Sequence, residues 1–268
     1  MKILVNLINK TLSFFKIRVI KIKTFQRLII SDNIKNNLNA IKNTGNEKSF
    51  KKAFLYFDNS TSQNNRIAID IFVLNYFNFK NNGYFLEFGA GNGVYNSNTL
   101  LMEKKFKWKG ILAEPANVYY PELKKNRQCI IEKNCLWSKS NLKLEFIEVD
   151  KKIESGMSTI ATYEDQDKFS NLRKKKNKKY LVNTITLLEV LNKHKAPKNI
   201  DFMSIDTEGS EFEILKNFDF KKYKFGFISC EHMWNLKKRS NIYKLLTKNG
   251  YERVYTDYSM QDDWYIKR

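Results

Sequence analysis

Cysteine and proline are scarce in this sequence, with three of each among 268 residues, and no Cys-x-x-Cys pair is present. The cysteines, Cys129, Cys135 and Cys230, lie in or beside apolar runs, and their number is odd. This pattern predicts buried, reduced thiols in a cytosolic protein. It argues against a disulfide framework and against a cysteine metal cluster.

Uninterrupted apolar runs are missing even from the apolar N-terminus. Lysine and arginine interrupt residues 1–25 too often for a membrane span, and no small-residue cleavage site follows an unbroken apolar core. The apolar residues recur at helical spacing, which predicts a basic amphipathic helix. Such a helix can lie in a membrane interface or dock on the protein's own surface. We expect a cytoplasmic protein, with peripheral contact of residues 1–30 to the inner face of the membrane as one alternative.

Acidic residues are few relative to basic ones. The chain has 28 Asp and Glu against 48 Lys and Arg, a net charge of +20. Nucleic acid, an anionic membrane or an acidic glycan could each use such a charge. Lysine, asparagine and isoleucine are abundant throughout, as in proteins encoded by AT-rich sequence, and this bias produces the same charge without any partner.

The length suits one α/β domain with a full core and is short for two. Residues 31–50 are polar and rich in Asn and Lys. We therefore expect an N-terminal segment and linker over residues 1–50 and one domain over residues 51–268.

Strand and helix patterns alternate from residue 84 onward. Strands are predicted at 84–88, 110–114, 129–133, 200–206 and 225–232, and helices at 94–106, 117–126, 186–194, 211–218 and 240–250. This alternation predicts a mostly parallel, doubly wound α/β sheet with helices on both faces. Residues 251–257 and 263–268 are expected to close it as an antiparallel pair.

Two further patterns qualify this alternation. Residues 143–149 predict a strand, and the polar, basic residues 154–179 predict an excursion from the sheet. Two helices are expected to begin with capping boxes, in which a Ser or Thr caps the helix and a Glu reaches back to it. The pairs are Thr186 with Glu189 and Ser210 with Glu213.

A glycine-rich turn follows the first strand, with the pattern Glu87-x-Gly89-Ala90-Gly91-x-Gly93. It lacks the Gly-Lys-Ser/Thr ending of a P-loop. In the dinucleotide pattern GxGxxG, the last glycine would fall on Val94, which disfavours a nicotinamide or flavin cofactor.

An acid followed by GxGxG is better suited to S-adenosylmethionine. Glycine lets the backbone approach a ligand closely, and Glu87 can position the cofactor's ammonium group. Glu114 ends the next strand and can accept hydrogen bonds from both ribose hydroxyls. Ordinary polar residues at strand ends remain the alternative reading of both acids.

The sequence resembles the FkbM-type methyltransferases from about Ser62 to the C-terminus. The resemblance is carried by "SQNNRIAIDIFVLNYF", "GYFLEFGAGNGVYNSNTLLMEKKFKWKGILAEPANVYYPELKKNR", "IDFMSIDTEGSEFEIL", "SCEHMWNLKKRSNIYKLLTKNGYERV" and "DDWYIKR", in that order. It implies a Rossmann-like class I methyltransferase fold, S-adenosylmethionine as cofactor, and O-methylation of hydroxyls, including those of sugars and natural products. The cofactor-binding residues expected on these grounds are Glu87, Gly89, Ala90, Gly91, Gly93, Asn98, Glu114, Pro115 and Asp206.

Catalytic candidates lie where two later strands end, because sites in doubly wound sheets lie beyond the carboxyl ends of the strands. Asp206 is the first candidate, facing the methyl donor or the acceptor hydroxyl. Glu231 and His232 follow the next strand, and the pKa range of histidine suits a general base. Glu208 can act with Asp206 or only favour the N-terminus of the next helix. Asp206, Glu231 and His232 could hold a divalent cation, but no spacing signature supports one and no metal is predicted.

These observations predict an S-adenosylmethionine-dependent O-methyltransferase acting on a hydroxyl of a sugar, glycan or related small molecule. The turn Asp206-Thr207-Glu208-Gly209 lacks the Asn/Asp-Pro-Pro-aromatic pattern of enzymes that methylate base amino groups, so nucleic acid is not the expected partner. RNA ribose methylation remains an alternative. A non-catalytic, membrane-associated interaction protein that retains the fold is another.

Overall fold

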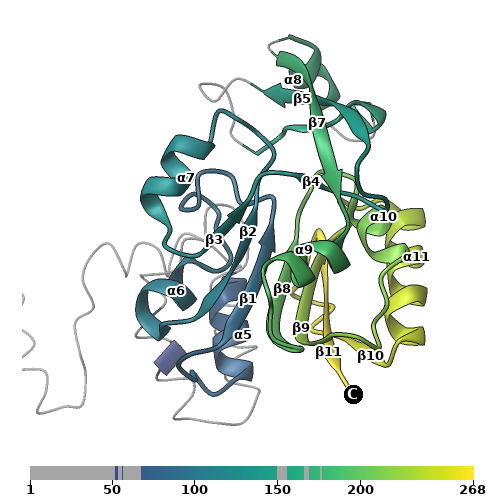
Figure 1. Ribbon diagram of the computed structural model, residues 1–268. Helices are drawn as coiled ribbons and strands as arrows, with labels where there is room; N and C mark the ends of the chain where they lie inside the picture. The colour runs from purple at the N-terminus through teal and green to yellow at the C-terminus, as the bar shows by residue number, and fades with distance from the viewer. Residues whose placement is uncertain (1–51, 54–55, 57–67, 150–155, 166–168, 176) are drawn as a thin grey trace, which may run out of the picture. The chain divides into compact units, whose positions relative to one another are not determined.

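The computed structural model describes residues 52–53, 56, 68–149, 156–165, 169–175 and 177–268 (Figure 1). The chain divides into two compact units, residues 1–58 and residues 59–268, and the description below concerns the second. The predicted N-terminal helix, the linker and the boundary at residue 50 lie outside the described residues. Within the described part of the chain, no helix combines the length and the apolar character needed to cross a membrane.

The main sheet of the second unit has seven strands. They are β1 (Tyr84–Phe88), β2 (Lys109–Ala113), β3 (Ile130–Glu132), β8 (Asn199–Ile205), β9 (Lys224–Glu231), β10 (Tyr251–Val254) and β11 (Asp262–Lys267). Their order is β10-β11-β9-β8-β1-β2-β3. Strands β3, β2, β1, β8 and β9 pair in parallel, whereas β11 is antiparallel to both β9 and β10. This confirms the predicted fold class, including the antiparallel C-terminal strand.

The central strands of the main sheet are apolar on both faces, so helices cover both faces and bury them. The helices of this layer are α5 (Ile69–Tyr76), α6 (Leu100–Phe106), α7 (Tyr120–Asn126), α9 (Leu187–Lys193), α10 (Glu211–Lys216) and α11 (Leu236–Lys248). Leu86 and Met203 pair across β1 and β8 and lie in one buried cluster with apolar residues of α9, α10 and α11. On β9, Phe227 lies within ring-contact distance of Tyr76 in α5.

The strand order reverses between β1 and β8, which carry the chain away from each other toward opposite edges of the sheet. In open α/β sheets, ligands bind beyond the carboxyl ends of the strands at such a switch point. The segments that follow β1 and β8 are the glycine turn and the turn of Asp206. The topology therefore brings these two predicted site segments together.

A second, smaller sheet lies beyond the carboxyl ends of the main strands, at the top of Figure 1. Its strands, in the order β4-β7-β5-β6, are β4 (Cys135–Leu136), β5 (Lys143–Val149), β6 (Thr159–Ile160) and β7 (Asn177–Ile185). A short 3-10 turn, η3 (Ala161–Tyr163), and helix α8 (Ser170–Lys175) connect β6 to β7. The predicted basic excursion contributes to this layer, but the sequence did not reveal that it pairs with β5 as a sheet.

Three predictions about helix starts were wrong, in whole or in part. The helix predicted from residue 94 begins only at Leu100, because the preceding residues form hydrogen-bonded turns. Ser210 does not cap α10, since its hydroxyl donates to Thr207 Oγ1 at 2.8 Å. Thr186 does cap α9, accepting the Glu189 N–H at 3.2 Å, although the Glu189 carboxylate accepts from Ser140 instead of reaching back.

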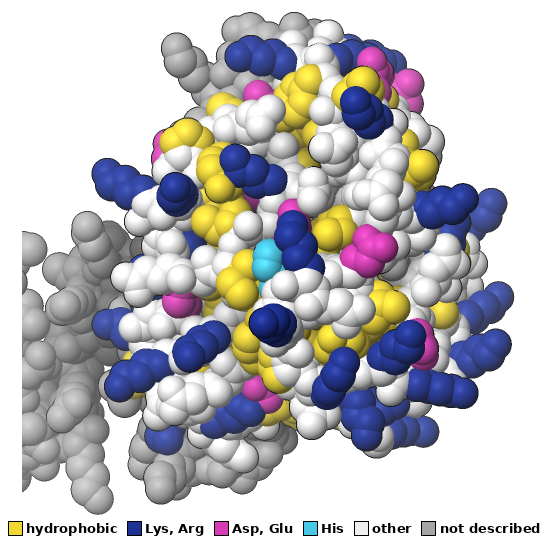
Figure 2. Space-filling model, viewed as in Figure 1, with side chains coloured by type: hydrophobic (Ala, Val, Ile, Leu, Met, Phe, Trp, Pro, Cys, Tyr) yellow, Lys and Arg dark blue, Asp and Glu magenta, His cyan; other side chains and the backbone are white. Residues whose placement is uncertain are grey.

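The positive charge is spread out on the face of the described residues that Figure 2 shows. Figure 2 shows lysine and arginine side chains distributed over the whole visible face of the described residues. This face has no single basic stripe of the kind that follows a nucleic-acid backbone.

Candidate active site

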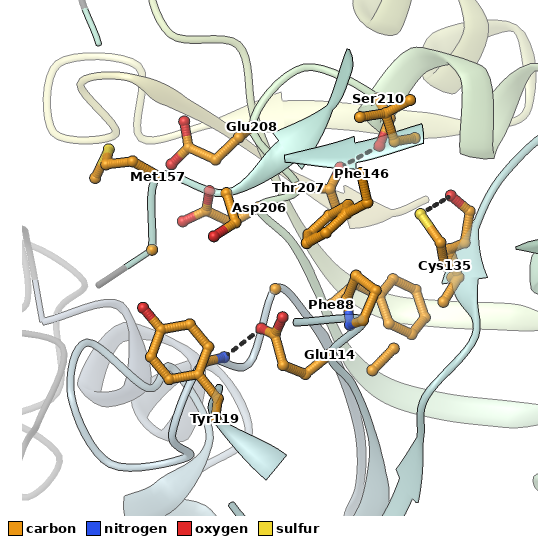
Figure 3. Close-up of a pocket in the computed structure, with 18 of the residues that line it drawn as sticks. Phe88, Glu114, Tyr119, Cys135, Phe146, Met157, Asp206, Thr207, Glu208 and Ser210 are labelled. Atoms are coloured by element: carbon orange, nitrogen blue, oxygen red, sulfur yellow. Dashed lines mark hydrogen bonds between the residues drawn. The ribbon is translucent and has the colours of Figure 1, made fainter. Parts of the chain in front are cut away.

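A cavity of about 940 Å³, counting space open to solvent, lies at the carboxyl ends of β1, β2 and β8 (Figure 3). Residues of β4, β5 and β6 in the second sheet, together with residues 156–158 before β6, line the side of the cavity away from the main sheet. Five of the predicted cofactor residues line the cavity: Gly89, Gly91, Glu114, Pro115 and Asp206. Other lining residues were not predicted, among them Asn92, Tyr95, Asn96, Tyr119, Met157 and Ser158.

The glycines of the turn meet different surroundings. A Cβ on Gly89 would lie 1.7 Å from the backbone carbonyl oxygen of Asp206, so only glycine allows the turns after β1 and β8 to touch. Gly91 has a φ of +52°, and a Cβ there would meet no protein atom within 4 Å. A Cβ on Gly93 would lie 2.6 Å from Arg127 Cγ, behind the turn. Gly91 is therefore the glycine whose open side a ligand can approach.

Glu114 lies at the end of β2, on the other side of the cavity from Asp206 and Glu208 (Figure 3). Its Oε2 accepts the Gly91 N–H at 2.7 Å and its Oε1 accepts the Ala116 N–H at 2.8 Å. Each oxygen keeps a second lone pair for another donor. Burial raises the pKa of Glu114 to about 7, and the nearby carboxylates of Glu148 and Asp206 add to the rise. Such a carboxylate gains from any hydroxyl donor that a ligand brings.

Two carboxylates, those of Asp206 and Glu208, line the opposite side of the cavity, and the predicted catalytic residue Glu231 is fully buried beside them, outside the lining. Ligand oxygens of Asp206, Glu208 and Glu231 all lie within 4.8 Å of one another. Glu208 has a φ of +55°, and its Oε2 lies 3.4 Å from Nη2 of the fully buried Arg173. We call these three residues the acid cluster. Its oxygens could accept a proton or hold a divalent cation.

The family model described as the methyltransferase FkbM domain matches residues 87–253. The chain belongs to the FkbM methyltransferase family. The match extends from the first acid of the glycine turn into β10, so it includes both sides of the cavity. Membership implies S-adenosylmethionine as the methyl donor.

Two solved structures are similar to this chain at low sequence identity. A precorrin-6y C5,15-methyltransferase from Geobacter metallireducens GS-15 is 13% identical, with 74% of this chain and 85% of that chain covered at a TM-score of 0.38. A human methyltransferase 10 domain containing protein is 15% identical, with 72% and 80% covered at a TM-score of 0.35. A comparison with curated proteins finds no match. The fold assignment rests on the strand order of this chain.

Glu87 is the first residue of the family match and precedes the glycine turn, but it does not line the cavity. Its carboxylate accepts the Ser97 hydroxyl at 3.0 Å, the Asn98 N–H at 2.6 Å and the Thr99 hydroxyl. With a buried side chain and these donors around it, Glu87 organises the turn before α6. This placement argues against the predicted contact of Glu87 with the cofactor's ammonium.

Arg127, which the sequence did not single out, completes the buried network around Glu87. Its side chain is fully buried, with Nη1 lying 3.5 Å from Glu87 Oε2 and Nε donating to Glu103 at 2.7 Å. It also donates to the Gly93 carbonyl at 3.1 Å and to the Thr99 hydroxyl at 2.9 Å. One guanidinium thus ties the end of the glycine turn to the start of α6.

Asn98 was predicted to bind cofactor, but it does not line the cavity. Its Nδ2 donates to Ser204 Oγ at 2.9 Å, which ties the turn to β8. Asn96 lies in the cavity wall instead, with a φ of +54°. Its Oδ1 is shielded from solvent and accepts no hydrogen bond from the residues that the structure describes. Ala90 is buried behind the wall.

His232, the predicted general base, also lies outside this cavity. It is 1% exposed, and its Nδ1 accepts the Trp234 N–H at 3.1 Å. Nε2 must then carry the ring proton, and it lies 3.7 Å from Asp263 Oδ1. Burial lowers the pKa of His232 to about 4. Both ring nitrogens face other protein groups, which argues against a role of His232 as general base. That role stays a prediction.

Proposed function

We propose that this protein is an S-adenosylmethionine-dependent O-methyltransferase acting on a hydroxyl of a sugar, glycan or related small molecule. The observation that carries the proposal is the arrangement of Glu114 opposite Asp206 and Glu208 across one cavity at the switch point of the sheet. One side offers acceptors for a ribose, and the other offers carboxylates for a hydroxyl proton.

The cavity fits the cofactor in chemical terms. Glu114 has a free lone pair on each oxygen for the ribose hydroxyls, and the open side of Gly91 allows close approach. Asn96 takes the role that the sequence suggested for Glu87. A buried side-chain oxygen without a donor gains free energy when a ligand ammonium supplies one.

The bound cofactor supplies a methyl group already activated on a sulfonium. The protein's own task is to hold an acceptor oxygen in line with that methyl and to remove its proton. A carboxylate of the acid cluster would take the hydroxyl proton as the acceptor oxygen bonds to the methyl carbon, with the electron pair of the broken bond left on the cofactor. Asp206 is the first candidate for this carboxylate because it lines the cavity, with Glu208 and Glu231 beside it.

Calorimetry with S-adenosylhomocysteine tests the proposal. We expect one site per chain, lost in Gly91→Val, where the new side chain fills the ligand's space, and in Glu114→Ala, which removes the ribose acceptors. Glu189→Ala, an acid-to-alanine change on α9 outside the cavity lining, is the control and should bind normally. Unchanged affinity in both cavity variants, or preferential binding of NAD, would overturn the assignment.

Contact of residues 1–30 with an anionic membrane surface and a cytoplasmic location stay predictions. Both concern residues or properties outside the described structure.

A further inference from the structure

A second pocket, of about 980 Å³ counting space open to solvent, lies beside the cofactor cavity. It lies among the turn after β8, helix α10 and the start of α11. Its lining includes Tyr163, Glu208, Phe212, His232, Lys237 and Asn241. Glu208 lines both spaces.

The acid cluster lies where the two spaces meet. Asp206 lines the cofactor cavity, Glu208 lines both spaces, and Glu231 directly precedes His232 in the wall of the second pocket. A molecule bound in the second pocket could therefore present a hydroxyl to the acid cluster and, through it, to the cofactor cavity. We propose that the second pocket binds the methyl acceptor, and that this acceptor is a polyhydroxylated molecule with an anionic group held by Lys237. This inference rests on the proposed function.

The neutral part of the lining suits a hydroxylated ring. Tyr163 packs on Gly209, where an added Cβ would lie 2.8 Å from its ring, and Phe212 adds a second aromatic side chain. Asn235 and Asn241 supply amide groups at the same pocket. Aromatic faces accept the C–H surface of a sugar ring, and a few amide groups orient its hydroxyls.

Among the charged side chains of the pocket lining, one cation has no ion-pair partner among the described residues and could bind a ligand anion. The other charged side chains have partners of opposite sign: Glu208 with Arg173 at 3.4 Å, Glu213 with Lys216 at 2.6 Å, and Lys238 with Glu211 at 2.7 Å. Lys237 is exposed, and no carboxylate of the described residues forms an ion pair with it. It lies in the first turn of α11, which contains no acidic residue, so the backbone dipole adds positive potential there. A carboxylate or phosphate on the acceptor complements this end of the pocket.

NMR titration of the full-length, ¹⁵N-labelled protein saturated with S-adenosylhomocysteine tests the inference. The probes are glucuronate and glucose 6-phosphate, which carry the anion as carboxylate or phosphate, and glucose, which carries none. We expect saturable shifts for one or both anionic sugars at residues 208–213 and 235–241, with glucose at least roughly threefold weaker. The stronger of the two anionic probes identifies the type of anion.

Two charge-matched variants of α11 sharpen the test. Lys237→Gln should weaken the anionic probe roughly three- to tenfold, the range expected for a partly exposed ion pair. Lys244→Gln removes the same charge from an exposed position of α11 outside the lining and should leave binding unchanged. Asn241→Trp should block the pocket while S-adenosylhomocysteine still binds.

Three outcomes would overturn the inference: equal effects of the two lysine variants, equal binding of glucose, or shifts that map elsewhere. If S-adenosylhomocysteine itself fails to bind the unmodified protein, the proposed function fails instead. The two failures are therefore distinguishable.

Discussion

Two acids flank the glycine turn of this protein, and their surroundings differ. Glu87 precedes the turn and is surrounded by protein donors, including two hydroxyls and the guanidinium of Arg127. Glu114 faces the turn from β2, and its two backbone donors leave a lone pair on each oxygen. The first acid is therefore part of the architecture of the turn, and the second is available to a ligand.

The same division separates two asparagines of the next segment. Asn98 is hydrogen-bonded to β8, whereas Asn96 lies in the cavity wall with a shielded oxygen that accepts no hydrogen bond from the described residues. Residues two positions apart thus serve different purposes. Changes on the architectural side should alter stability, and changes on the cavity side should alter ligand binding.

The largest effect is expected from Arg127→Met. Removing this guanidinium takes the buried cation away from the Glu87 and Glu103 carboxylates, which costs about 3–5 kcal/mol of unfolding free energy for a buried pair. Urea denaturation followed by circular dichroism measures this loss. Lys104→Met, which removes an exposed cation 3.8 Å from Glu103, should cost about 1 kcal/mol or less.

A companion variant tests whether Glu87 is architectural. Glu87→Gln should lower stability while the folded protein binds S-adenosylhomocysteine with nearly unchanged affinity. If Glu87→Gln abolished binding and left the urea midpoint intact, Glu87 would belong to the ligand site after all.

The second effect is a pH dependence that Glu114 should impose. Its pKa in the folded protein is about 7, above the ordinary value of 4.5, so the folded state binds more protons between these values. The contribution of Glu114 to the free energy of unfolding is fully present below about pH 4.5. It is lost as the pH rises toward 7, which lowers the free energy of unfolding by up to about 3 kcal/mol. Glu114→Gln should therefore be more stable than the unmodified protein at pH 8. At pH 4.5 this stability gain should be smaller or absent.

The same group should link ligand binding to pH in the opposite sense. Ribose hydroxyls donate to the ionised carboxylate, so binding favours the charged form of Glu114 and becomes stronger as pH rises from 6 to 8. Calorimetry of S-adenosylhomocysteine should show a rise of several-fold over this range. A pH-independent affinity would mean that the ribose does not rely on Glu114.

Much of the fold was predictable because the central strands are short apolar runs bounded by turns. The strand predicted at 84–88 is β1, and the antiparallel pair at the C-terminus forms as β10 and β11. The second sheet was only partly foreseen, since β4 and β6 have two residues each and carry no periodicity. The late start of α6 was missed because it depends on the side chain of Glu87, which lies in another element.

Site residues could be predicted where their position at a strand end brings them to the cavity. They could not be predicted where the direction of the side chain decides whether a residue lines the cavity. Glu114 and Asp206 follow strand ends, and both line the cavity. Arg127 follows a helix in a run of basic residues, so nothing in the sequence distinguishes it from its solvated neighbours. The sequence pointed to Asn98, whereas the cavity is lined by Asn96, whose left-handed φ is not readable from the sequence.

The smallest of these effects should distinguish the two asparagines. Asn96→Leu keeps the size of the side chain but removes its polar atoms, so it should weaken S-adenosylhomocysteine roughly tenfold through the lost bond to the ammonium. The ligand 5′-methylthioadenosine has the adenine and ribose but no amino acid end, and its affinity should stay within about twofold. Asn98→Leu removes the bond to Ser204 and should lower the urea midpoint without changing the ratio of the two affinities. Calorimetry with both ligands on the three proteins measures this ratio directly. If Asn96→Leu weakened both ligands equally, Asn96 would shape the cavity as a whole, and the ammonium would have to be held by another lining group, with the carboxylate of Asp206 as the next candidate.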